Sequence, residues 1–123
     1  MSPQPDTVSV IIPCYRQAGF LPEAIESVLA QTHPHQEIVV GDDGSPDDTA
    51  GVAARYARLG NVRYVRQSNQ GLAAARNTGM AMSSSDYLVF LDADDWLLSN
   101  HFATALDAFK AHPEAAFVCG DFR

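Results

Sequence analysis

The chain alternates short runs of β-branched and other apolar residues with segments of helical periodicity. The strand-like runs lie at 8–13, 37–43, 61–66, 86–91 and 115–119, and the helical segments lie at 21–31, 45–59, 71–82 and 100–112. Consecutive strands joined by helices pair in parallel, because each helix crosses over the sheet to reach the next strand. The order therefore predicts an α/β fold with a doubly wound, mostly parallel sheet and helices on both faces.

Three of the predicted helices have an apolar face that can cover this sheet. The residues of these faces are Ile25, Val28 and Leu29, then Val52, Tyr56 and Leu59, then Phe102, Leu106 and Phe109. Ser45 is expected to be the N-cap of the second helix, with Pro46 at the first helical position and Asp48 two residues further on.

The composition limits the kinds of partner. The 123 residues are enough for one domain, and 46% of them are hydrophobic, which is too many for a disordered chain. The formal net charge of −7 argues against nucleic acid or an anionic membrane surface as the main partner, since both attract basic patches. A phosphorylated small molecule is compatible with this charge, because a divalent cation can supply positive charge locally.

Residues 1–7 are expected to form a flexible N-terminal tail, and residues 8–123 a single domain. Cys14 and Cys119 have no metal-type spacing and lie at the ends of apolar runs, so we interpret them as core thiols of a protein in the reducing cytoplasm. No apolar stretch reaches the roughly 18 residues of a membrane span, although peripheral attachment to the inner face of a membrane is compatible with the sequence.

Polar loops follow the predicted strands at their carboxyl ends. They read CYRQAG, DDGSPDD, QSNQGLAAARN and DADDWL, and they meet at the edge where parallel α/β sheets bind ligands. Taken singly, each loop has a structural explanation: Asp43 is part of a turn, Tyr15 is a strand-end aromatic, and Arg76 is a solvated side chain. Four such loops on one edge favour a binding site.

Asp92, Asp94 and Asp95 form the most chemically distinctive group. Like charges at this spacing repel, so the cluster is either a solvated turn before a helix or is stabilised by a cation. Mg²⁺ and Mn²⁺ prefer oxygen ligands, and proteins usually hold them with carboxylates, substrate phosphates and water. The cluster therefore predicts a Mn²⁺ or Mg²⁺ site that would attract a diphosphate.

Four segments together resemble the N-terminal, nucleotide-sugar-binding half of family-2 glycosyltransferases. They are VSVIIPCYRQAGFLPEAIESVLAQT, EIVVGDDGSPDDT, NQGLAAARNTGM and DYLVFLDADDWL, in this order and spacing. The resemblance covers nearly the whole chain from Val8 and implies a Rossmann-like fold of the GT-A type. It also implies a donor site in which Asp43 accepts a hydrogen bond from the base, Tyr15 stacks near the base and the Pro13 backbone contacts it.

The resemblance assigns the remaining site residues to the diphosphate and a metal. Arg76 would reach the nucleotide or the diphosphate. Asp92 and Asp94 would form the metal-binding pair, with Asp92 also near the ribose and Asp94 the better direct ligand, and Asp95 would lie behind them. The implied reaction is the transfer of a sugar, with inversion, from a nucleotide diphosphate sugar to a hydroxyl of a carbohydrate, lipid-linked or other acceptor. UDP is the expected nucleotide.

The same resemblance implies further elements after the fifth strand, including a catalytic base. No carboxylate downstream of Asp95 lies in a recognisable base motif. We therefore expect the chain to be truncated before the acceptor-binding half, with Asp121 near the acceptor side at most. We also expect apolar surface around 115–123 to favour self-association.

Other functions fit less well, with one exception. A sugar-1-phosphate nucleotidyltransferase would need a glycine-rich, basic loop after the first strand, and a dehalogenase-type phosphatase would carry its aspartates there. The main alternative is a module that binds the nucleotide sugar without turning it over, or an inactive fragment that lacks the catalytic base.

Overall fold

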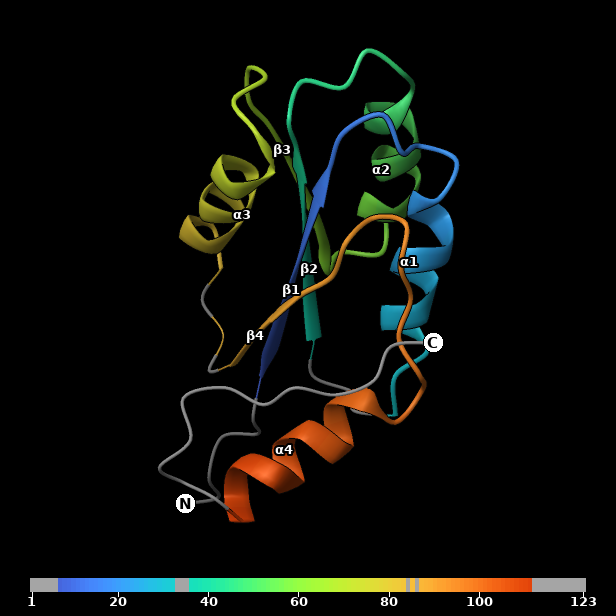
Figure 1. Ribbon diagram of the computed structural model, residues 1–123. Coiled ribbons are helices and arrows are strands. Elements are labelled where there is room, and N and C mark those ends of the chain that lie inside the picture. Colours follow the sequence, from blue (N-terminus) through green and yellow to red (C-terminus); the bar gives the residue numbers. More distant parts are fainter. Residues whose placement is uncertain (1–6, 33–35, 84, 86, 112–123) are drawn as a thin grey trace.

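The structure is a computed structural model that describes residues 7–32, 36–83, 85 and 87–111. Its strands are β1 (Val8–Cys14), β2 (Gln36–Asp42), β3 (Val62–Arg66) and β4 (Tyr87–Phe90), and its helices are α1 (Leu21–Leu29), α2 (Thr49–Ala57), α3 (Leu72–Ala81) and α4 (His101–Ala111). The strands form one sheet in the order β3-β2-β1-β4, and every adjacent pair is parallel. The predicted parallel α/β architecture is confirmed (Figure 1).

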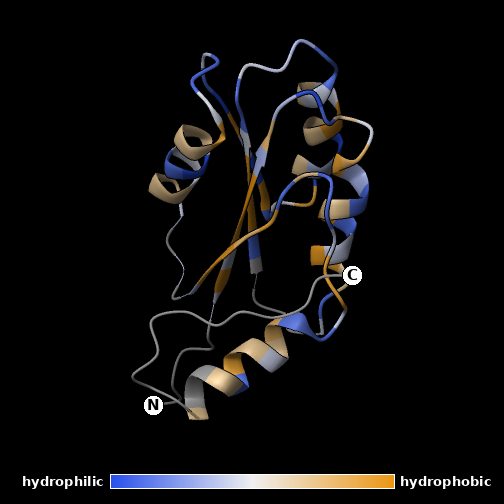
Figure 2. Cartoon of the chain, in the orientation of Figure 1, coloured by the Kyte–Doolittle hydropathy of each residue, from blue (hydrophilic) through white to orange (hydrophobic). Residues whose placement is uncertain are grey.

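Helices cover both faces of the sheet, as predicted. Figure 1 shows α1 and α2 on one face and α3 on the other. β1, a central strand, is buried along its whole length, because its alternate residues face the two helical layers. Val10 and Ile12 join the core cluster with Ile25 of α1, whereas Ile11 faces Gly79 of α3. Figure 2 shows the apolar strands leading up to hydrophilic loops at their carboxyl ends.

The chain leaves β4 and crosses to α1 before it forms α4. The Ser27 hydroxyl accepts a hydrogen bond from the Leu97 N–H at 3.0 Å. The buried Gln31 amide donates to the Leu98 carbonyl at 2.6 Å and accepts from the Phe102 N–H at 3.0 Å. Ser27 of α1 and Gln31, two residues beyond the end of α1, therefore fix the segment that follows the acidic cluster. None of the described helices is both long and apolar enough to cross a membrane.

The prediction for the start of the second helix is wrong. α2 begins at Thr49, and its N-cap position is Asp48, whose side chain makes no capping hydrogen bond. Ser45 lies buried in the preceding loop, where its hydroxyl accepts the Arg16 N–H instead. The helix ends at Ala57, so Leu59 lies beyond it, and this residue is 58% exposed instead of facing the core.

Some expectations concern residues that the structure does not describe. The predicted fifth strand at 115–119, Asp121 and residues 1–6 of the predicted tail all lie outside the described ranges. Thr7, the last residue of that tail, precedes β1 directly, and its carbonyl accepts a hydrogen bond from the Tyr87 N–H. Cys14 is a buried thiol, as expected, and burial raises its pKa to about 11.

Two glycines let α3 approach the sheet closely. A Cβ at Gly41 of β2 would lie 2.8 Å from the carbonyl oxygen of Ala75, and a Cβ at Gly79 would lie 2.5 Å from Cγ2 of Ile11. Real Cβ atoms do not come this close, so a side chain at either position would push the helix off the sheet. Because Ala75 precedes Arg76, this packing also determines where the Arg76 side chain starts.

Gly41→Ala is expected to lower the free energy of unfolding by about 1–3 kcal/mol, the usual cost of overpacking a close-packed interior. Urea unfolding followed by circular dichroism measures the change. Gly19→Ala is the matched control, because a Cβ at Gly19 meets nothing within 4 Å. Equal stability of the two variants would contradict the close packing of α3 on β2.

Candidate functional site

The polar loops lie at one edge of the sheet. Cys14, Asp42 and Arg66, the last residues of β1, β2 and β3, pair side by side. β4 runs in the same direction beside β1, so Asp92 and Asp94, which follow it, leave from the same edge. This is the edge at which parallel α/β sheets bind ligands.

Asp43, directly after β2, is the most heavily bonded of the predicted site residues. Its Oδ1 accepts from Gln67 Nε2 at 2.8 Å and from the Gln70 N–H at 2.8 Å. Its Oδ2 accepts from Asn69 Nδ2 at 3.1 Å and from the Gly71 N–H at 3.0 Å. All four donors belong to the loop between β3 and α3, so the buried Asp43 carboxylate fixes that loop.

These hydrogen bonds lower the pKa of Asp43. The Gln70 N–H has the largest effect, burial opposes it, and the Gln67 amide and Gly71 N–H add to it. Since the folded-state pKa lies below the unfolded value of about 3.9, the bonds contribute stability above that pH. The contribution is lost as the pH falls through the folded-state pKa. Asp43 is therefore a charged acceptor at neutral pH.

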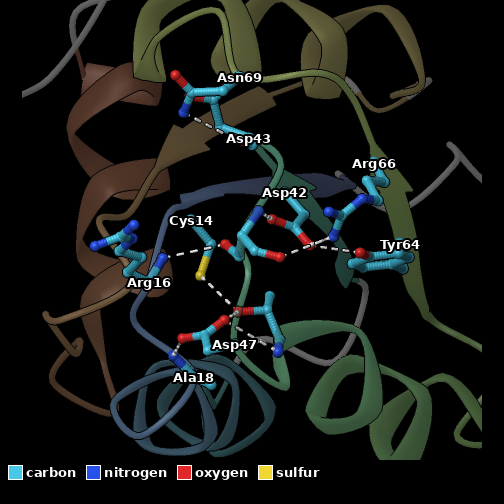
Figure 3. Close-up of polar contacts among 11 residues, drawn as sticks. Cys14, Arg16, Ala18, Asp42, Asp43, Asp47, Tyr64, Arg66 and Asn69 are labelled. Atoms are coloured by element: carbon cyan, nitrogen blue, oxygen red, sulfur yellow. Dashed lines mark hydrogen bonds and ion pairs between the residues drawn. The ribbon is translucent and has the colours of Figure 1, made fainter.

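Asp42, the fully buried last residue of β2, organises the other side of the site. Its Oδ1 accepts the Ser45 N–H at 2.8 Å, and its Oδ2 accepts from the Tyr64 hydroxyl and from Arg66 Nη1 at 3.3 Å (Figure 3). Arg66 also donates to the Ser45 carbonyl at 3.0 Å. Burial and the bond to Asp42 raise the pKa of Tyr64, so its hydroxyl stays a donor. These hydrogen bonds connect β3 to the end of β2 and to the loop that follows it.

Pro13 and Tyr15 lie at the end of β1. Pro13 is buried in the strand and pairs with Gly41 of β2. Tyr15 is half-buried, and the guanidinium carbon of Arg16 lies 5.4 Å from the centre of its ring. That separation is within the range of a cation–π interaction.

Asp92, Asp94 and Asp95 converge after β4. Each offers one carboxylate oxygen, and these atoms all lie within 4.8 Å of one another. The Asp95 N–H donates to the Asp92 carbonyl at 2.9 Å and closes the turn that gathers them. Asp92 and Asp94 are exposed and Asp95 is half-buried. Clustered carboxylate oxygens are the donors that Mg²⁺ and Mn²⁺ prefer, so the residues fit such an ion.

Arg76 lies on α3 beside this cluster. Its Nη2 is 3.3 Å from Asp92 Oδ1, and the two side chains are 38% and 54% exposed. Exposed ion pairs are worth only about 0–1 kcal/mol. The Arg76 guanidinium can therefore release Asp92 and bind an incoming anion at little cost in free energy.

The sequence pattern does not indicate that Asp42 organises this edge or that Ser45 bonds the loop after β1. The pattern around Ser45 predicts a helix cap, and its spacing from the strand does not indicate a contact with the loop after β1. The available signal was the succession of short polar residues at 42, 43, 45, 47 and 49, which can satisfy backbone N–H groups of neighbouring loops.

Comparison with known proteins identifies relatives of the chain. The family model for "Glycosyl transferase family 2" matches residues 9–122. Among curated proteins, the chain is similar to the uncharacterised glycosyltransferase EpsJ of Bacillus subtilis (strain 168). The two are 35% identical over 117 residues, which make up 94% of this chain and 34% of EpsJ.

Two solved structures are similar to the chain in fold. TarS from S. aureus in complex with UDP gives a TM-score of 0.81 at 26% identity, over 87% of this chain and 33% of that one. Mannosyltransferase PcManGT from Pyrobaculum calidifontis, in complex with GDP-Man and Mn²⁺, gives 0.78 at 27% identity, over 86% of this chain and 34% of that one.

The chain spans about a third of the length of EpsJ and of the two solved chains. The family model nevertheless covers β1 from Ser9 onward, β2, β3, β4, the acidic cluster and the loops that surround it. The chain belongs to glycosyl transferase family 2 and has the GT-A fold of its glycosyltransferase relatives.

Proposed function

We propose that this chain binds a nucleotide diphosphate sugar, with UDP as the expected nucleotide, and supplies the donor half of a sugar transfer to a hydroxyl acceptor. The observation that carries the proposal is the cluster of Asp92, Asp94 and Asp95 beside Arg76, on the ligand-binding edge of a family-2 chain. The complexes of TarS with UDP and of PcManGT with GDP-Man and Mn²⁺ support a nucleotide-sugar donor.

The base of the bound nucleotide would lie between the ends of β1 and β2. Tyr15 offers an aromatic face there, the Pro13 backbone lies beside it, and Asp43 offers a carboxylate to a base N–H. Each Asp43 oxygen already accepts two hydrogen bonds. A nucleotide base would therefore donate to an Asp43 oxygen that also accepts from Gln67 or Asn69, or would replace one of these side-chain donors.

The diphosphate would lie nearer β4. Asp94 and Asp92 would hold Mn²⁺ or Mg²⁺, with Asp92 also close to the ribose and Asp95 behind them. A cation bound there would offset the negative charge of the departing diphosphate. Arg76 would contribute charge-assisted hydrogen bonds to the nucleotide or the diphosphate.

In the proposed reaction an acceptor hydroxyl attacks the anomeric carbon and the nucleoside diphosphate leaves, so the configuration inverts. A general base must take the hydroxyl proton. The aspartates at 92, 94 and 95 are assigned to the cation, and the chain spans 34% of the curated relative EpsJ. We therefore propose that the base belongs to an acceptor-binding half outside these residues.

Calorimetric titration with UDP is expected to show binding that depends on Mn²⁺. Asp94→Ala should weaken this binding about tenfold or more, because removing even an indirect partner of a metal typically costs that much. The unfolding temperature should not change, since Asp94 is exposed. Asp107→Ala, at an exposed position of α4, is the charge-matched control. Undiminished binding of UDP and Mn²⁺ by Asp94→Ala would rule out the metal assignment.

Asp43→Asn is expected to reduce discrimination among bases more than it reduces affinity for the diphosphate. The amide replaces one acceptor oxygen with a donor, and a buried group left unpaired costs about 1–3 kcal/mol. Titrations with UDP, CDP, GDP and pyrophosphate would separate the two effects. Equal losses for all four ligands would show that Asp43 acts only by fixing the 67–71 loop.

Sugar transfer by these 123 residues alone is expected to be far below an enzyme-like rate. A general base contributes about 10²–10⁴-fold, and positioning the acceptor contributes more. The test is a radiolabelled transfer assay with a broad acceptor panel, comparing this chain with a longer form of the protein. Equal turnover would place the base within this chain, whereas donor binding without turnover by either form would favour a binding-only module.

A further inference from the structure

The segment that joins β1 to α1 has an unusual backbone conformation. Arg16 has a φ of 56°, and it is the one residue other than glycine with a positive φ in the described part of the chain. Glycine adopts this region freely, but a residue with a Cβ does so only when its surroundings hold it there. Arg16 directly follows Tyr15, to which we assign base stacking.

Two side chains from the loop after β2 hold this segment. The Ser45 hydroxyl accepts the Arg16 N–H at 3.1 Å, and Asp47 Oδ2 accepts the Ala18 N–H at 3.1 Å (Figure 3). The other oxygen of Asp47 accepts the Thr49 hydroxyl at 2.6 Å and the Thr49 N–H at 3.3 Å. The strained segment is therefore held at two backbone positions: the N–H of Arg16 itself and the N–H of Ala18, two residues further on.

The holding side chains are themselves fixed. Ser45 is only 2% exposed, and its own N–H donates to Asp42. Thr49 is fully buried. The Thr49 hydroxyl is the main cause that lowers the pKa of Asp47, and the Ala18 N–H adds to it, so Asp47 is a charged acceptor at neutral pH.

The ring of Tyr15 depends on this segment in two ways. Its backbone leads directly into the strained residue, and the Arg16 guanidinium lies over the ring, 5.4 Å from its centre. If the segment moved, both the position of the ring and the cation covering it would change. The Tyr15 ring would then no longer lie where a nucleotide base could stack on it.

We infer that Ser45 and Asp47 are positioning residues of the nucleotide site, which hold the strained segment 15–18 so that Tyr15 is presented to the base. The inference rests on the proposed nucleotide-binding function. Neither residue needs to contact the ligand, because each acts through a backbone N–H of the neighbouring loop.

The first test measures the segment itself by amide hydrogen exchange in NMR spectra. Asp47→Ala removes both acceptor oxygens, so the Ala18 amide should exchange about tenfold faster or more, while amides within β1 and β2 keep their parent rates. Asp48→Ala is the matched control, because it changes the charge equally one residue away at a side chain that makes no capping bond. Unchanged exchange at Ala18 in Asp47→Ala would overturn the inference.

The second test asks whether the segment serves the site. With Mn²⁺ saturating, Asp47→Ala should weaken UDP binding by about tenfold, as expected when a preorganised contact is loosened, and leave the affinity for Mn²⁺ alone unchanged. Asp47→Asn, which retains one acceptor oxygen, should fall between Asp47→Ala and the parent. Asp48→Ala should bind like the parent.

The outcomes separate this inference from the proposed function. A parent protein that does not bind UDP would overturn the proposed function and, with it, the positioning role. A parent that binds UDP, together with an Asp47→Ala variant that binds equally well despite faster exchange at Ala18, would overturn the positioning role alone. A loss of Mn²⁺ affinity equal to the loss of UDP affinity would indicate a general structural defect and would also overturn it.

Discussion

Hydrogen bonding by the adjacent carboxylates of Asp42 and Asp43, at the end of β2, organises the loops after β2 and β3 at the ligand-binding edge. Successive residues of a strand face opposite sides, so the two carboxylates serve different neighbours. Asp42 bonds β3 and the loop that follows β2, and Asp43 bonds the loop that follows β3. Loop N–H groups have no ladder partner and still require an acceptor when buried. A charged oxygen satisfies this need more strongly than a neutral one.

Five aspartates at the ligand-binding edge fall into two physical classes. Asp42, Asp43 and Asp47 accept hydrogen bonds from backbone, amide, hydroxyl or guanidinium donors in neighbouring strands and loops. Asp92 and Asp94 are exposed, and Arg76 pairs with Asp92 only at the surface. The three hydrogen-bonded aspartates hold loops in place, whereas Asp92 and Asp94 leave carboxylate oxygens exposed to a ligand. This difference is the physical basis for assigning the cation to the residues after β4.

Helix packing links the two ends of the proposed site. α3 lies close to β2 at Gly41 and close to β1 at Gly79, because these glycines have no Cβ, and this approach carries Arg76 to the acidic cluster. From the other face, Ser27 of α1 and Gln31, just beyond the end of α1, bond the segment at 97–102 that follows the cluster. The acidic turn is therefore held between a glycine-mediated contact on one face and polar anchors on the other. A rigid support of this kind favours a preorganised cation site.

Local sequence patterns correctly predict how the four described strands alternate with helices, that these strands are parallel, and the edge on which Tyr15, Asp43, Arg76, Asp92 and Asp94 lie. These features follow from local periodicity and from the general rule that parallel strands end at one edge. They can therefore be predicted without knowing any particular long-range contact. The course of residues 44–48 depended on tertiary structure. A capping pattern favoured a helix start at Ser45, but bonds from Arg16 and to Asp42 hold that residue in a loop instead. The strain at Arg16 and the fourfold bonding of Asp43 were likewise decided by partners 24 to 29 residues away, which a local pattern cannot specify.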